Sequence, residues 1–259
     1  MEALKKWKIN YLSPSSIATF IENPAMYVME KIFNYKFKGS ASASRGTFIE
    51  KGVNQILSTD NIDALLPFKV SKEIVQDFIN ECEQYKYPKE DIDKELFFIE
   101  KAIQVLPAKL KQFGKVVGYQ KEVGYDYKGV QLKGYTDFEF SNNDNLLFID
   151  LKTTGKIPKA TTRHKIQQYI YSKATNVENR LFYIQVLKTK EPRIEEYKLT
   201  EEDEVMIPLL VNQAINNINV LCSLANTKED WKRLVTPNPD DWKWNDADKQ
   251  KARKEIWGY

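Results

Sequence analysis

The stretch Leu146-Leu147-Phe148-Ile149-Asp150-Leu151-Lys152 decides how the rest of this sequence is interpreted. Its first four residues are apolar, which predicts a buried strand. Side chains alternate between the two faces of an extended strand, so Asp150 and Lys152 should point the same way while Leu151 points into the core. The end of this strand would therefore present a carboxylate and an ammonium group side by side.

A tight turn is predicted directly before this strand, at residues 141–145, where serine, asparagine and aspartate cluster. Residues 136–140 would form the preceding strand. The hairpin would then bring Asp137, near the start of one strand, beside Asp150 at the end of the next. Hard oxygen ligands of this kind suit a divalent cation, and Lys152 lies next to them. The convergence outlines a site that cleaves phosphodiester bonds.

The spacing of Asp137 from Asp150-Leu151-Lys152 resembles the core motif of the PD-(D/E)xK nuclease superfamily. Thr136 stands where the name of the family places a proline. The resemblance implies metal-dependent DNA cleavage, most often exonucleolytic. It also implies an α/β fold in which helices flank a mixed central β-sheet, as in restriction endonucleases.

Four flanking segments resemble the RecB/AddB-like branch of this superfamily, which is similar to the phage lambda-type exonucleases. Arg45-Gly46-Thr47-Phe48-Ile49-Glu50 is similar to the R-G-T-x-x-H/E helix motif, and Gln167-Gln168-Tyr169-Ile170-Tyr171 to the Q-x-x-x-Y helix motif. Tyr11-Leu12-Ser13-Pro14-Ser15 resembles the N-terminal L-S-x-S opening of a helix. Glu122 stands where the branch often carries a glutamate, and we expect it to have a structural role, holding Arg45 or a lysine.

The resemblance implies a set of metal ligands: Glu50, Asp137, Asp150 and the backbone carbonyl of Leu151. A carboxylate at position 50, where many relatives carry a histidine, gives an all-oxygen site suited to Mg²⁺ or Mn²⁺. Lys152 would orient or deprotonate the attacking water, or stabilise the phosphoryl charge. The sequence does not choose between these roles.

Two segments without acidic residues, 31–47 and 151–177, flank the proposed catalytic motifs and carry basic side chains. Phosphates must come close there, so we expect DNA contacts. The alternatives are a solvated basic face for the lysines, an ion pair for Arg45 and a plain amphipathic surface for the pair at 167 and 171. The candidate DNA contacts are Lys36, Lys38, Arg45, Lys156, Lys159, Arg163, Gln167 and Tyr171.

The 259 residues suffice for one domain spanning 1–259. Residues 58–113 are expected to form a helical insert between Glu50 and the sheet, because apolar residues recur there at helical spacing. Small residues at 40–44 predict a loop. Further segments are expected as helices at 14–32, 161–175 and 200–224, and as strands at 116–126, 129–140, 146–153, 181–188 and 193–199.

Iron–sulfur members of the RecB/AddB-like branch carry a cysteine before a proline in the first helix and three more near the C-terminus. Here Asn23-Pro24 and Trp242-Lys243-Trp244-Asn245 stand in those places, so no iron–sulfur cluster is expected. Segment 226–259 is rich in tryptophan and would pack on the N-terminal helix in place of the cluster. The rival role of these tryptophans is stacking on unpaired bases.

The sequence as a whole therefore predicts a metal-dependent DNA exonuclease of recombination or DNA processing, acting on linear duplex or single-stranded DNA. It would be cytoplasmic, in a bacterium or a phage-infected cell, because no secretory signal and no long apolar run is evident. A partner protein of recombination or self-association would fit such a role. The alternatives are a structure-specific or single-strand endonuclease with the same site, and a non-catalytic DNA-binding subunit.

Overall fold

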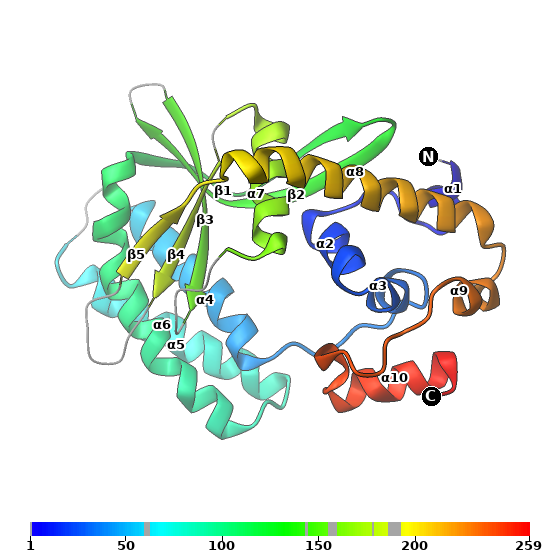
Figure 1. Cartoon of the computed structure of the whole chain (residues 1–259). Helices are drawn as coiled ribbons and strands as arrows, with labels where there is room; N and C mark the ends of the chain where they lie inside the picture. The colour runs from blue at the N-terminus through cyan, green and yellow to red at the C-terminus, as the bar shows by residue number, and fades with distance from the viewer. Residues whose placement is uncertain (1, 60–62, 143–144, 155–159, 178, 186–192) are drawn as a thin grey trace.

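The computed structural model describes residues 2–59, 63–142, 145–154, 160–177, 179–185 and 193–259. Its centre is a five-stranded sheet in the order β1-β2-β3-β4-β5, in which β3 and β4 are parallel and the other neighbours antiparallel. The predicted mixed sheet flanked by helices is therefore confirmed (Figure 1). The strands are β1 (Lys115–Tyr127), β2 (Val130–Asn142), β3 (Asn145–Thr154), β4 (Asn179–Gln185) and β5 (Arg193–Tyr197).

One face of the sheet is covered by three helices, α4 (Ala41–Leu57), α5 (Leu66–Gln84) and α6 (Lys89–Leu110), the last followed by the short η1 (Lys111–Phe113). Their apolar side chains share one core with Ile149 of β3 and its neighbours on the same face of the sheet. The segment predicted as a helical insert, 58–113, thus supplies two of the three helices of this layer, α5 and α6. The expected loop at 40–44 is wrong: α4 begins at Ala41, because the Ser40 side chain caps it by accepting from the backbone N–H of Ala43.

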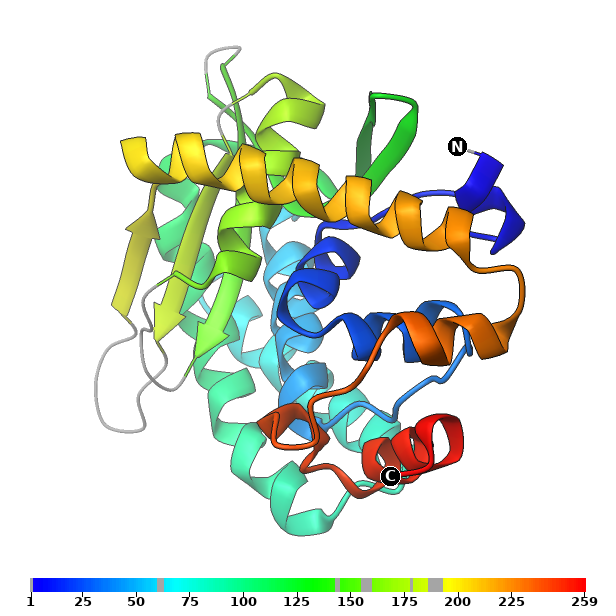
Figure 2. The ribbon, with the colours of Figure 1, turned by 45° about the vertical axis from the view of Figure 1, so that its right-hand side comes forward.

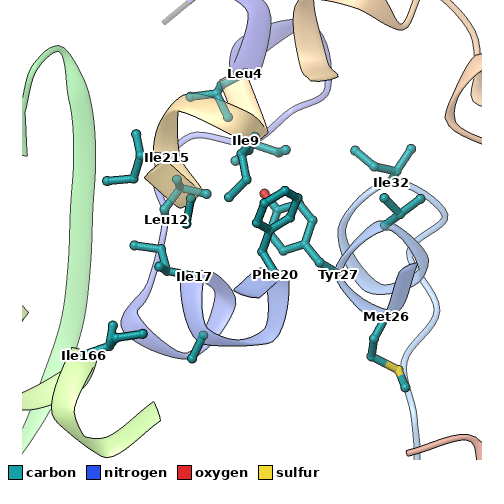
Figure 3. Packing of buried hydrophobic residues seen from close by; sticks show 14 of the residues in the cluster. Leu4, Ile9, Leu12, Ile17, Phe20, Met26, Tyr27, Ile32, Ile166 and Ile215 are labelled. Carbon is teal, nitrogen blue, oxygen red and sulfur yellow. The ribbon is translucent and has the colours of Figure 1, made fainter. Parts of the chain in front are cut away.

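The opposite face is covered by α7 (Thr162–Thr175), which connects the parallel strands, together with α2 (Pro14–Glu22) and α8 (Glu201–Leu224). Phe148 belongs to this second core, whereas the next residue, Ile149, belongs to the first. This alternation along β3 is the one expected of a strand buried on both faces. Figure 3 shows part of the second core, where Ile17, Ile166 and Ile215 lie together.

Helices from both ends of the chain lie together beside this core (Figure 2). Trp231 is buried and meets Trp7 edge to face, with ring centroids 5.5 Å apart. Trp244 is also buried, whereas Trp242 is 73% exposed. The elements involved are α1 (Glu2–Lys6), α3 (Pro24–Lys31), α9 (Lys228–Leu234), η2 (Trp242–Trp244) and α10 (Ala247–Trp257).

Among the described helices, α8 alone is long and apolar enough to cross a membrane, as judged by length and composition. A core helix meets the same criterion, and α8 buries one face, including Ile207, Val211 and Ile218, in the second core. Its first turn is acidic, with Thr200 as N-cap. The helix runs from the sheet to the N-terminal helices in both views (Figures 1 and 2).

Replacing Trp231 by Ala should lower the free energy of unfolding by about 3–5 kcal/mol, because it empties a large buried site between the chain ends. Trp242→Ala is the matched control and should change the free energy by no more than about 0.5 kcal/mol, since its ring is exposed. Urea titration of both variants measures the difference. Equal losses of stability in the two variants would contradict the role of Trp231 as the buried contact between the chain ends.

Candidate active site

Two aspartates meet where the β2–β3 hairpin ladder ends. The pair farthest from the turn is Phe138↔Ile149. Continuing the same register by one residue sets Asp137 opposite Asp150. There the Asp137 carboxylate replaces the backbone partner: its Oδ2 accepts from the backbone N–H of Leu151 at 2.8 Å. The aspartate thereby fixes the end of β3 and is held at a defined position itself.

Asp150 is 2% exposed, and protein groups engage both of its carboxylate oxygens. Lys152 Nζ lies 2.5 Å from Oδ2, and Gln167 Nε2 of α7 donates to Oδ1 at 2.7 Å. Asp150 and Lys152 thus point to the same face of the strand, while Leu151 is buried in the first core. A buried carboxylate needs such partners, because an unpaired charge is costly away from water.

Glu50 reaches this cluster from α4, and Gln120 of β1 approaches its carboxylate at 3.5 Å. Burial and the charge of Asp150 raise the pKa of Glu50 to about 7, against the opposing effect of Lys152. The pKa of Asp137 is raised for the same reasons, by burial and then by Asp150 and Glu50. When ionised, the three carboxylates of this cluster carry more negative charge than Lys152 neutralises.

Burial by itself would lower the pKa of Lys152, but the charges of Asp150 and Asp137 outweigh it and raise the pKa. The ammonium form is therefore the stable one at neutral pH. Lys152 is therefore a fixed positive charge among the carboxylates of this cluster.

The residues fit the predicted divalent cation in charge and donor type, because three carboxylates face one lysine and the oxygen ligands are hard. As placed in the described part of the chain, however, no three Asp, Glu, His or Cys side chains form a ready cage for a metal. The oxygens of Asp137 and Asp150 are turned toward Leu151, Lys152 and Gln167 instead. Loading a cation therefore requires side-chain rotation within the cluster.

Two predicted DNA contacts are engaged inside the protein. Tyr171 is 5% exposed, and its hydroxyl accepts from the backbone N–H of Tyr135 at 3.2 Å. A Cβ at Gly134 would lie 2.4 Å from Cε1 of the Tyr171 ring, so this tyrosine packs where only glycine fits. Arg45 pairs with Glu95 of α6 at 2.5 Å, which is the kind of ion pair given as its alternative role, and its phosphate contact stays a prediction.

The remaining predicted residues, one structural and five for DNA contact, lie in different surroundings. Glu122 pairs with Lys133 at 2.7 Å, and not with Arg45. Arg163 binds Glu22 at 2.8 Å and Thr19 at 3.2 Å, so it joins α7 to α2. Lys36 and Lys38 are exposed on the segment between α3 and α4. Lys156 and Lys159 lie outside the described residues.

Three residues near the site were not singled out by the sequence. Tyr119 of β1 has its pKa raised to about 12 by burial and by Glu50 and Asp137. Its neighbour Gln120, which approaches Glu50, has a left-handed backbone with φ 48°. His164 of α7 is half-buried, and its pKa is lowered by burial and by the charge of Lys152. No motif marks these residues.

Comparison with known proteins identifies the class. The family model of the PD-(D/E)XK nuclease superfamily matches residues 11–242, so the chain belongs to this superfamily. A hydrolase acting on phosphodiester bonds of DNA is the activity that membership carries. No curated protein sequence matches the chain.

The solved structures that are similar to this chain include the following two. One, from Eubacterium rectale and named "Putative exonuclease", has a TM-score of 0.53 at 15% identity, over 86% of this chain and 83% of that one. This likeness shows the fold. The other, named SSO0001, has a TM-score of 0.33 at 19% identity, over 66% of this chain and 84% of that one, and supports no argument.

The raised pKa of Glu50 predicts how stability depends on pH without metal. Between about pH 4.5 and 7 the folded protein retains a proton that the unfolded chain has released, so the free energy of unfolding falls as pH rises through this range. Mg²⁺ should restore stability most above about pH 7, where the Glu50 carboxylate is ionised. Thermal unfolding in EDTA and in Mg²⁺ measures both effects.

Glu50→Gln is the control, because it removes the titrating group and keeps the shape of the side chain. His164 titrates in the opposite sense and Asp137 in the same sense as Glu50, so the quantity to compare is the difference between wild type and variant. A variant that retains the full decline in stability between pH 4.5 and 7 would contradict the assignment to Glu50.

Proposed function

We propose that this protein is a Mg²⁺- or Mn²⁺-dependent deoxyribonuclease that degrades linear DNA from an end, in the manner of the RecB/AddB-like branch but without an iron–sulfur cluster. The observation that carries the proposal is the buried Asp150–Lys152 pair beside Asp137 and Glu50, in a chain that belongs to a nuclease superfamily. The exonuclease name of the Eubacterium rectale neighbour is in keeping with this.

The chain's own residues have distinct parts in this chemistry. Glu50, Asp137, Asp150 and the Leu151 carbonyl hold the cation, which when bound neutralises phosphoryl charge and makes water more acidic. Lys152, already protonated, stabilises the charge that grows on the phosphoryl oxygens, and this favours the electrostatic role over that of a base. Gln167 keeps Asp150 in place.

The proposed cellular role is the one that suits an enzyme degrading DNA from its ends. An end-degrading nuclease serves DNA recombination or processing in the cytoplasm of a bacterium or of a phage-infected cell. A partner protein or a second copy of the chain would hold the DNA end during repeated cleavage.

Asp150→Asn should abolish cleavage of end-labelled linear DNA in Mg²⁺ while leaving the fold intact, because the amide oxygen can still accept from Gln167. Wild type should lose the same activity in EDTA. Closed circular DNA of the same sequence distinguishes the modes of attack: resistance supports an exonuclease, whereas equal cleavage indicates an endonuclease. Wild-type rates for the Asp150→Asn protein would show that the metal assignment is wrong.

Lys152→Ala should lower turnover by about 10²–10³-fold, as expected when one stabilising charge in a buried site is removed. DNA affinity should fall only modestly, since one cation is a small part of it. Lys133→Ala is the matched control, because Lys133 pairs with Glu122 on the same sheet but at the surface. Equal turnover of the two variants, measured on linear DNA, would contradict the catalytic role of Lys152.

A further inference from the structure

Trp242 is the most exposed large hydrophobic side chain in the described part of the protein, at 73%. Both of its neighbours are anchored. Asp241 accepts from Asn23 Nδ2 at 2.9 Å, and Lys243 pairs with Glu22 at 2.9 Å. The backbone that carries this indole is therefore held against the junction of α2 and α3, and the ring is displayed to solvent from a fixed support.

The ring forms part of a surface pocket of about 500 Å³. Lys243 lies over the indole, with Nζ 5.8 Å from the ring centroid. Three cations and two carboxylates line the pocket, so its lining is mixed in charge, with an excess of only one cation. A bare phosphate would find little net attraction there, whereas the edge of a nucleobase offers both hydrogen-bond donors and acceptors. The charged lining residues are Arg163, Lys243, Lys249, Glu30 and Asp246.

This pocket adjoins the active site through α7. Glu22 binds both Lys243, beside Trp242, and Arg163 at the start of α7. One helical turn further along α7, Gln167 holds Asp150. His164, between them, lies close enough to Lys152 and to Arg163 for both charges to act on it. A strand that reaches the carboxylates can therefore extend over the pocket.

We propose that Trp242 stacks on an unpaired base of the DNA strand that enters the active site, so that the protein recognises a single-stranded end. Every base presents an aromatic face, so an exposed indole binds it without regard to sequence. The mixed pocket wall contacts the base edge. This proposal rests on the proposed DNA nuclease function and adds the strandedness of its substrate.

Binding in EDTA tests the proposal independently of cleavage. The probes are a duplex with a single-stranded overhang, the same duplex with abasic units in the overhang, and a blunt duplex, each followed by fluorescence anisotropy. Trp242→Ala should weaken binding of the normal overhang by about 5- to 150-fold, as expected for one stacked base. The abasic probe should bind wild type and Trp242→Ala equally. Trp242→Phe should retain most of the affinity.

Phe68→Ala is the matched control, because Phe68 is a 52% exposed aromatic residue on α5, away from the pocket. It should bind all probes as wild type does. Equal loss by Trp242→Ala on normal and abasic overhangs would overturn the stacking role, and so would unchanged binding. Cleavage in Mg²⁺ with unchanged binding would leave the nuclease function standing, whereas base-dependent binding without cleavage would support the stacking site and refute the enzyme.

Discussion

The buried carboxylate of Asp150 is the constraint around which the centre of this protein is built. A carboxylate at 2% exposure has lost its contact with water and needs cationic or hydrogen-bonding partners, and here Lys152 and Gln167 each bind one of its oxygens. The first partner comes from the same strand two residues on. The second comes from α7, so the carboxylate depends on how closely that helix packs on the sheet.

The close packing of α7 on the sheet requires a glycine at position 134 of β2. The Tyr171 ring lies so near the strand that any larger residue would collide with it. The tyrosine hydroxyl in turn accepts the backbone N–H of Tyr135, which satisfies a strand donor. The two residues of the Gln/Tyr pair on one face of α7 thus have different structural roles: Gln167 positions the Asp150 carboxylate, and Tyr171 positions the helix.

The same cluster is electrostatically unbalanced in the absence of a cation. Glu50 and Asp137 have raised pKa values because burial and Asp150 oppose their ionisation. A protein optimised only for stability would avoid this arrangement, whereas functional sites commonly retain it. The excess negative charge of these carboxylates suits the cluster to a divalent cation, although its side chains must rotate to enclose one.

The sequence by itself determined the elements and the local part of the site. Alternation along residues 146–152 and the turn before them specify the hairpin, and they place Asp137 near Asp150 because strand register is a local property. Helical periodicity likewise predicted α6, whereas α7 was expected from the Q-x-x-x-Y helix motif that it carries. Only the tertiary structure decided the partners of the remaining residues. Arg45 meets Glu95 from another helix, and Trp242 is exposed while Trp244, two residues on, is buried. Such contacts join segments far apart in the chain, and no local pattern of residues encodes which of several similar side chains will find a partner.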